Sequence, residues 1–204
     1  MNVKKKIVLF IFIIIFVYAI GGIVYILMNK EKNPEPIKVS NLDTIKGYDY
    51  ALRSNDTSLY KEIFNHLKDN LEGESINDEE YAKDIAKLFI IDLYTLNNKI
   101  NKYDVGGSAF VHPDYVANYK LNVQNTLYKY MEDNSYDNRN QELPEVSSVE
   151  VITSEKTNYK IDNNSLNGYK VTLEWSYTKD LGYDSKGIVT LVKIDNVYYV
   201  VQKD

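Results

Sequence analysis

The sequence predicts an α+β protein with one N-terminal transmembrane helix, followed by three helices packed on a curved four-stranded antiparallel sheet. Three observations carry this prediction. Residues 7–28 hold no charged side chain, the next part of the chain places apolar residues at helical spacing, and the last part alternates apolar and polar residues as strands do. Because the expected strands follow one another with turn-rich joints, they should form a meander whose apolar face the helices cover.

The segment from Ile7 to Met28 is long enough to cross the roughly 30 Å hydrocarbon core of a bilayer as a helix. Lys4, Lys5 and Lys6 precede it, so the positive-inside rule favours a cytoplasmic tail of residues 1–6 and a C-terminal domain outside the cell membrane. A cleaved signal peptide is the alternative, but its apolar region typically spans only about 7 to 15 residues. The sequence therefore predicts a single-pass protein that has the membrane as one partner.

Charge and cysteine content limit the classes of partner and the chemistry that the chain can have. The chain carries a net charge of −5 and has no cysteine. Residues 1–32 contain five lysines and one glutamate, so residues 33–204 carry a net charge of −9. An acidic domain repels phosphate backbones, which argues against nucleic-acid binding and favours protein partners or a homo-oligomer. The absence of cysteine excludes disulfides and thiolate chemistry.

Residues 29–40 separate the predicted membrane helix from the rest of the chain. They include Pro34 and Pro36 among charged residues and show no apolar periodicity, which predicts an extended linker. Residues 41–204 fall within the size range of one domain. We expect this domain to be helical from 41 to 133 and to form the sheet from 146 to 204.

Three amphipathic helices are predicted in the first half of this domain. The first runs from Ser58 to Leu71, the second runs from near Asn77 to about Asn101, and the third has Pro113 at its first position. The residues expected on their apolar faces are Leu59, Ile63, Leu67 and Leu71, then Ala82, Ala86, Phe89, Leu93, Leu96 and Ile100, and then Val116, Tyr119, Val123, Leu127 and Tyr130.

The second half changes to a period of two residues. Trp175 lies in the clearest strand, from Tyr169 to Tyr177, and should point into the core. The dipeptide Asp195-Asn196 suits a type I′ hairpin turn. The other strands expected are one from Val149 to Ile161, one from Ile188 to Ile194 and one from Val197 to Val201.

This order of elements resembles that of the nuclear transport factor 2-like (cystatin-like cone) superfamily. The resemblance rests on the segment from Ile7 to Met28, the helical stripe around Phe89 and the strand around Trp175. The most similar topology is that of membrane-anchored assembly proteins of conjugation and type IV secretion systems. The resemblance implies the fold and the topology and transfers no functional residue, since members of the superfamily include enzymes, ligand binders and scaffolds.

Asp92 is the one charged residue that falls within the apolar sector of the second helix. A carboxylate in that position must be hydrogen-bonded, paired or neutral. One interpretation is structural, with Asp92 accepting from the hydroxyl of Tyr81 or Tyr103 or pairing with Lys99. The other is a small pocket in which Asp92 acts as a general base.

No other residues form a recognisable site. His66 is expected on a solvated helix face and His112 in the turn before Pro113, and neither has a second ligand at i+4, so we predict no metal. The acidic segment that begins at Asp133 has Pro144 where a calcium loop needs a glutamate, and the one that begins at Asp162 has Leu166 at its third ligand position, so both are interpreted as turns. No catalytic residue and no cofactor are predicted.

The function predicted from these features is a membrane-anchored extracytoplasmic interaction or assembly domain without catalysis, for example in a bacterial secretion, conjugation or envelope machine. The alternative is a small-ligand-binding or isomerase-like pocket protein centred on Asp92, with Tyr81, Lys99 and Tyr103 around it.

Overall fold

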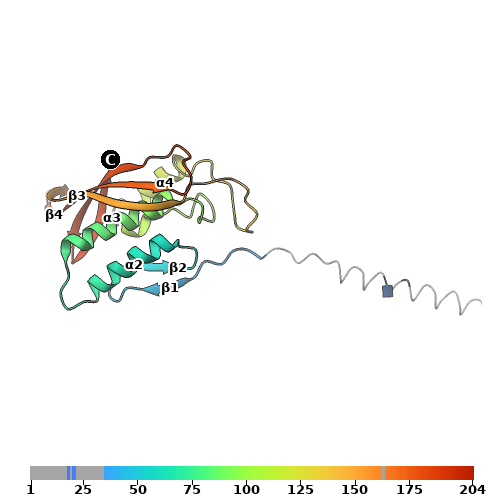
Figure 1. The fold of residues 1–204 in the computed structure, drawn as a ribbon, viewed down its shortest axis with the longest axis horizontal. Helices are drawn as coiled ribbons and strands as arrows, with labels where there is room; N and C mark the ends of the chain where they lie inside the picture. The colour runs from blue at the N-terminus through green and yellow to red at the C-terminus, as the bar shows by residue number, and fades with distance from the viewer. Residues whose placement is uncertain (1–17, 19, 22–34, 162–163) are drawn as a thin grey trace, which may run out of the picture. The chain divides into compact units, whose positions relative to one another are not determined.

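A computed structural model describes residues 18, 20–21, 35–161 and 164–204. The chain divides into two units, Met1–Glu35 and Pro36–Asp204. The second unit contains the sheets, the described helices of eight residues or more and the core, and it is shown with its elements labelled in Figure 1.

The membrane-spanning helix is the part of the fold prediction that must be corrected. In the described part of the chain, no helix is both long enough and apolar enough to cross a membrane. Most of the range from Ile7 to Met28, together with the predicted tail 1–6 and residues 29–34 of the predicted linker, lies outside the described residues. The unit Pro36–Asp204 has an α+β fold.

The elements of this unit follow the predicted order of helices first and sheet second, with one addition. A small two-stranded sheet that the sequence did not indicate precedes the helices. The elements are β1 (Asn41–Thr44), β2 (Ala51–Arg53), α2 (Ser58–Leu71), α3 (Asp78–Tyr94), the 3-10 helix η1 (Ser108–Phe110), α4 (Val116–Asn125), β3 (Val146–Ile161), β4 (Asn164–Tyr177), β5 (Lys186–Ile194) and β6 (Val197–Lys203).

α3 is the central helix of the unit. In Figure 1 it lies between the four-stranded sheet on one side and α2 with β1 and β2 on the other. Because both sides are covered, α3 buries residues around almost its whole circumference and not only along the predicted stripe. Asn77 caps its first turn by accepting from the amides of Glu79 and Glu80.

The helix predictions were right in type, and their ends differ from the structure in two cases. α2 has the predicted bounds, although Tyr60 and Phe64 are more deeply buried than Leu59 and Ile63. α3 ends at Tyr94, before the predicted end near Asn101, because the chain turns there toward the sheet. Thr95 still donates its amide to the helix, but the amides of Leu96 and Asn97 both donate to the carbonyl of Pro144, just before β3.

The third helix is also shorter than predicted. It begins at Val116 because residues 113–115 form a turn closed on the carbonyl of His112. It ends at Asn125, where Thr126 leaves the helical region with φ −122° and ψ −90°. Tyr130, expected on the apolar face, is 78% exposed. Since the helix stops short of it, the predicted apolar face does not extend that far.

The four-stranded sheet is the predicted meander, with strand order β3-β4-β5-β6 and antiparallel pairing throughout. Trp175 is 3% exposed and packs against Tyr94 of α3, with 5.1 Å between ring centroids. Asp195 and Asn196 both have positive φ, at 48° and 68°, as a type I′ turn requires. The inward face and the hairpin turn of the prediction are thus confirmed.

Candidate functional site

The predicted site residue Asp92 lies in the last turns of α3 and is held by three donors. Its Oδ1 accepts from Nζ of Lys99 at 2.6 Å and from the guanidinium of Arg53 at 3.2 Å. Its Oδ2 accepts from the backbone amide of Gly107 at 2.6 Å. Arg53 also pairs with Asp104 at 3.1 Å. We call Asp92, Lys99, Arg53 and Asp104, together with Asp56, the Asp92 cluster.

Two glycines let the loop after α3 approach Asp92. A Cβ on Gly106 would lie 1.9 Å from the backbone carbonyl oxygen of Asp92, so no side chain fits at that position. Gly107 has φ +74°, in the left-handed region where glycine is favoured. The sequence Gly106-Gly107 therefore brings an amide to the carboxylate of Asp92.

The charges of the cluster decide the protonation of its carboxylates. Burial by itself would raise the pKa of Asp92, but the charges of Lys99 and Arg53 and the hydrogen bonds from Lys99 and Gly107 outweigh it and lower that pKa. Burial raises the pKa of Asp56, whose side chain is 2% exposed. Asp92 is consequently ionised at neutral pH, with both oxygens occupied.

A cavity of about 220 Å³ lies beside the Asp92 cluster. Tyr103 and Arg53 line it together with Asp92, and Tyr103 is 67% exposed. A general base needs a free carboxylate oxygen directed at its substrate. The arrangement around Asp92 instead favours an ion-paired structural role.

The structure brings together only part of the predicted pocket. Lys99 pairs with Asp92, as the structural interpretation proposed. Tyr103 lines the cavity, and neither Tyr103 nor Tyr81 bonds the carboxylate. Tyr81 instead shares a 2.8 Å hydrogen bond with the hydroxyl of Tyr50 within the core. Sequence reasoning missed Arg53, and the one available signal was that arginine is rare among the cations of this chain.

The histidines lie as single residues and not in a metal site. His66 is half-exposed on α2, and its Nδ1 lies 2.5 Å from Oδ2 of the fully buried Asp84. His112 is buried, and its carbonyl closes the turn that contains Pro113. Among the described residues, no group of three His, Cys, Asp or Glu side chains could hold a metal ion.

Asp133 lies in a turn, as predicted, since its carboxylate accepts from the amide of Ser135. The second acidic segment, which begins at Asp162, lies partly outside the described residues, because residues 162 and 163 are not described.

The outer edge of β3 is a second feature that could serve function. Trp175 of β4 donates its amide to the carbonyl of Ser185, on the β5 side. Backbone groups alternate in direction along an antiparallel strand, so Tyr169 of β4 also faces β5. Its partner Lys156 therefore directs its backbone N–H and C=O away from β4, and the same alternation applies to Ser154.

In the described part of the chain, no other backbone segment pairs with this edge. No backbone hydrogen bond joins residues 148–161 of β3 to any element other than β4. A groove of about 510 Å³ runs beside it, between Glu79, Lys83 and Lys87 of α3 and residues 149–154 of β3. Ile152, at the irregularity between Val151 and Thr153, is 51% exposed.

No protein-family description, curated protein or solved structure matches this chain. The resemblance to the nuclear transport factor 2-like superfamily therefore stays a prediction from the order of elements.

Proposed function

We propose that residues 36–204 form a non-catalytic interaction domain that binds an extended segment of a partner protein along the outer edge of β3. The observation that carries this proposal is the open edge itself. Within the described chain, β3 runs for 16 residues with β4 as its sole backbone partner, beside a groove bounded by α3. An edge strand next to a helix is a known arrangement for binding a peptide as an added strand.

The side chains along the edge support a selective partner. Proteins protect exposed edges from random pairing with charges and β-bulges. β3 has exposed charges at Glu150, Glu155, Lys156 and Lys160 and irregularities in its register, so an unmatched strand is disfavoured. The exposed Ile152 offers an apolar contact in the middle. A complementary segment would thus combine an apolar side chain with charges opposite in sign to those of β3.

The alternative function, a pocket with Asp92 as general base, gains less support. The carboxylate of Asp92 already accepts hydrogen bonds from Lys99, Arg53 and Gly107. The pKa of Asp92 is lowered, whereas a general base that works at neutral pH needs a raised pKa. A structural role for Asp92 leaves the interaction surface as the better supported function.

The test uses Lys156, because proline at this position removes a backbone donor from the open edge and none from the β3–β4 ladder. Peptides are first selected on the full chain from a random display library, and the dissociation constant of each is measured. Lys156→Pro should weaken binding about tenfold or more, since an edge hydrogen bond is lost and the ring obstructs a neighbouring strand.

Lys156→Ala is the matched control, because it removes the same side chain and keeps the amide. It should change the dissociation constant by less than about twofold. Sedimentation of the chain alone tests whether the partner is a second copy of this chain. If it is, Lys156→Pro should dissociate the dimer into monomers. Equal peptide binding by the proline and alanine variants, with unchanged melting temperatures, would reject the proposal.

A further inference from the structure

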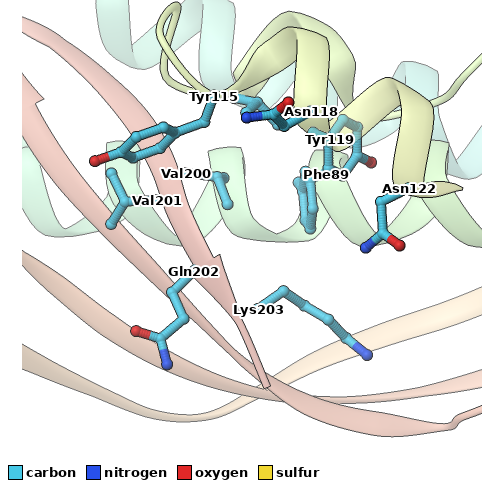
Figure 2. Close-up of a pocket in the computed structure, with 10 residues that line it drawn as sticks. Phe89, Tyr115, Asn118, Tyr119, Asn122, Val200, Val201, Gln202 and Lys203 are labelled. Atoms are coloured by element: carbon cyan, nitrogen blue, oxygen red, sulfur yellow. The ribbon is translucent and has the colours of Figure 1, made fainter.

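The groove between α4 and β6 has a composition different from that of the β3 edge. Its volume is about 380 Å³, within the usual range for small-molecule sites. Figure 2 shows Tyr115, just before α4, near Val201 of β6, and Tyr119 of α4 near Phe89 of α3. The wall is therefore mainly aromatic and aliphatic.

Tyr119 presents its ring to the groove and not a free hydroxyl. The hydroxyl of Tyr119 donates to the carbonyl of Gly106 at 2.7 Å and is thereby satisfied. Its ring lies 5.9 Å from that of Phe89, centroid to centroid. An apolar body placed in the groove would contact ring faces and the methyl groups of Val201 without burying an unpaired hydroxyl of Tyr119.

Lys203 is the one formally charged residue in the lining. Its ammonium donates to the hydroxyl of Tyr94 at 2.7 Å and lies 3.3 Å from a carboxylate oxygen of Asp184. An ammonium has three donors, so a third remains for a ligand. The side chain of Asp184 is 66% exposed, which means that solvent screens its pairing with Lys203.

Asn122 adds a neutral polar group at the same end of the groove. Its side chain points from α4 toward the side where Lys203 lies in Figure 2. No described residue hydrogen-bonds its side-chain amide, which is thus available as a donor. A cation and an amide donor at one end of an apolar groove are complementary to a carboxylate attached to an apolar body.

We propose that this groove binds a small apolar monocarboxylic acid, with its carboxylate on Lys203 and Asn122 and its hydrocarbon or aromatic body between Tyr119 and Val201. This proposal is independent of the β3 edge. Binding there would not require an open strand, and the peptide site would not require the groove.

The experiment measures binding of phenylacetate, its neutral analogue phenylacetamide and the straight-chain acids from acetate to octanoate to the full chain by titration calorimetry. Phenylacetate should bind about tenfold more tightly than phenylacetamide, because the carboxylate gains a charged hydrogen bond. Affinity should rise about threefold to fourfold for each added methylene until the groove is filled.

Three variants separate the roles of the charges. Lys203→Met keeps the length of the side chain and should remove the preference for the acid over the amide. Asp184→Asn removes the competing carboxylate and should tighten phenylacetate binding severalfold, with no effect on phenylacetamide. Asn122→Asp places a negative charge on an exposed α4 position and should weaken only the acids. Lys186→Met, at an exposed position on β5, is the control and should change neither.

The melting temperature of each variant shows whether it folds. Because Asn122 is on the surface, Asn122→Asp still tests the proposal if Lys203→Met does not fold. The proposal is overturned if the acid and the amide bind equally well, if affinity does not depend on chain length, or if no acid binds at millimolar concentration.

Discussion

Two aspartates on the same helix show how partners decide the state of a buried carboxylate. Asp84 and Asp92 lie eight positions apart on α3, about 12 Å along its axis. Burial is the largest influence on both, yet the pKa of Asp84 is raised and that of Asp92 is lowered. The difference comes from their partners and not from the helix.

Asp92 has cations that the fold holds in place, since the side chain of Lys99 is fully buried and that of Arg53 is 26% exposed. Asp84 depends on the half-exposed His66 and on Lys87 at 3.4 Å. A cation that is close and kept away from water interacts more strongly with a carboxylate than one that is farther away or partly solvated. The fully buried Lys99 at 2.6 Å, with Arg53 and the amide of Gly107, thus offsets burial at Asp92, whereas the half-exposed His66 and Lys87 at 3.4 Å do not offset it at Asp84.

The largest effect is expected for Lys99→Met, which leaves Asp92 with a buried charge that only Arg53 and Gly107 offset. Breaking a buried pair typically costs about 3 to 5 kcal/mol, and we expect a loss in that range from the free energy of unfolding. Chemical denaturation measures it. Lys61→Met, at an exposed position on α2, is the control and should cost less than about 0.5 kcal/mol. A loss as small as that control would show that Lys99 does not stabilise the cluster.

Asp92→Asn should lower the free energy of unfolding somewhat less, by about 2 to 4 kcal/mol, because it leaves the charge of Lys99 without its carboxylate but keeps an oxygen for the amide of Gly107. Asp92→Ala should cost more than Asp92→Asn, because it also removes the oxygen that accepts from Gly107. Since the pKa of Asp92 is lowered on folding, its stabilisation is present above the unfolded value near 3.8 and is lost as pH falls through the folded value. Melts across pH should show this acid loss in the parent and not in Asp92→Asn. A higher melting temperature for Asp92→Asn would instead favour the pocket with a general base.

His66→Ala tests the surface partner of Asp84. Nδ1 of the imidazole lies 2.5 Å from Oδ2 of Asp84, which also keeps Lys87, so removal of the imidazole should cost about 1 kcal/mol at neutral pH. Measuring the same change in an Asp84→Asn background completes a double-mutant cycle. If His66→Ala costs as much there as in the parent, the two side chains are not coupled.

Asp84→Asn should have the smallest effect, within about 1 kcal/mol at neutral pH. Burial raises the pKa of Asp84, so between the unfolded value near 3.8 and the folded value the native state binds more protons, and stability falls as pH rises through that window. The asparagine variant lacks this slope. Relative to the parent it should become more stable as pH rises from about 4, as thermal melts can show. A cost at neutral pH equal to that of Asp92→Asn would remove the distinction between the two carboxylates.

Local patterns explain why much of the fold could be predicted. The bounds of α2, the meander and the turn at Asp195-Asn196 all depend on residues close in sequence. The end of α3 could not be found in this way, because the amide of Leu96 turns to the carbonyl of Pro144, far along the chain. β1 and β2 are too short to show a period.

The same division holds for the Asp92 cluster. Asp92 conflicts with its apolar neighbours in the helix, and Lys99 lies close enough in sequence to be proposed as its partner. Arg53 comes from β2, and Gly107 from a loop whose path depends on packing against α3. Tyr81 and Tyr103 are near Asp92 in the helical pattern, but such a pattern does not specify where a hydroxyl points.

The strand order of the sheet has a consequence for how the domain folds. Every ladder joins strands that are neighbours in sequence, from β3–β4 to β5–β6, so each pairing closes only a short loop and little chain entropy is lost. The contacts of α3 with this sheet join residues far apart in sequence, because the long segment that contains η1 and α4 lies between them. We therefore expect the amides of the β5–β6 hairpin to gain protection from hydrogen exchange earlier in refolding than the contacts of α3 with Trp175 form.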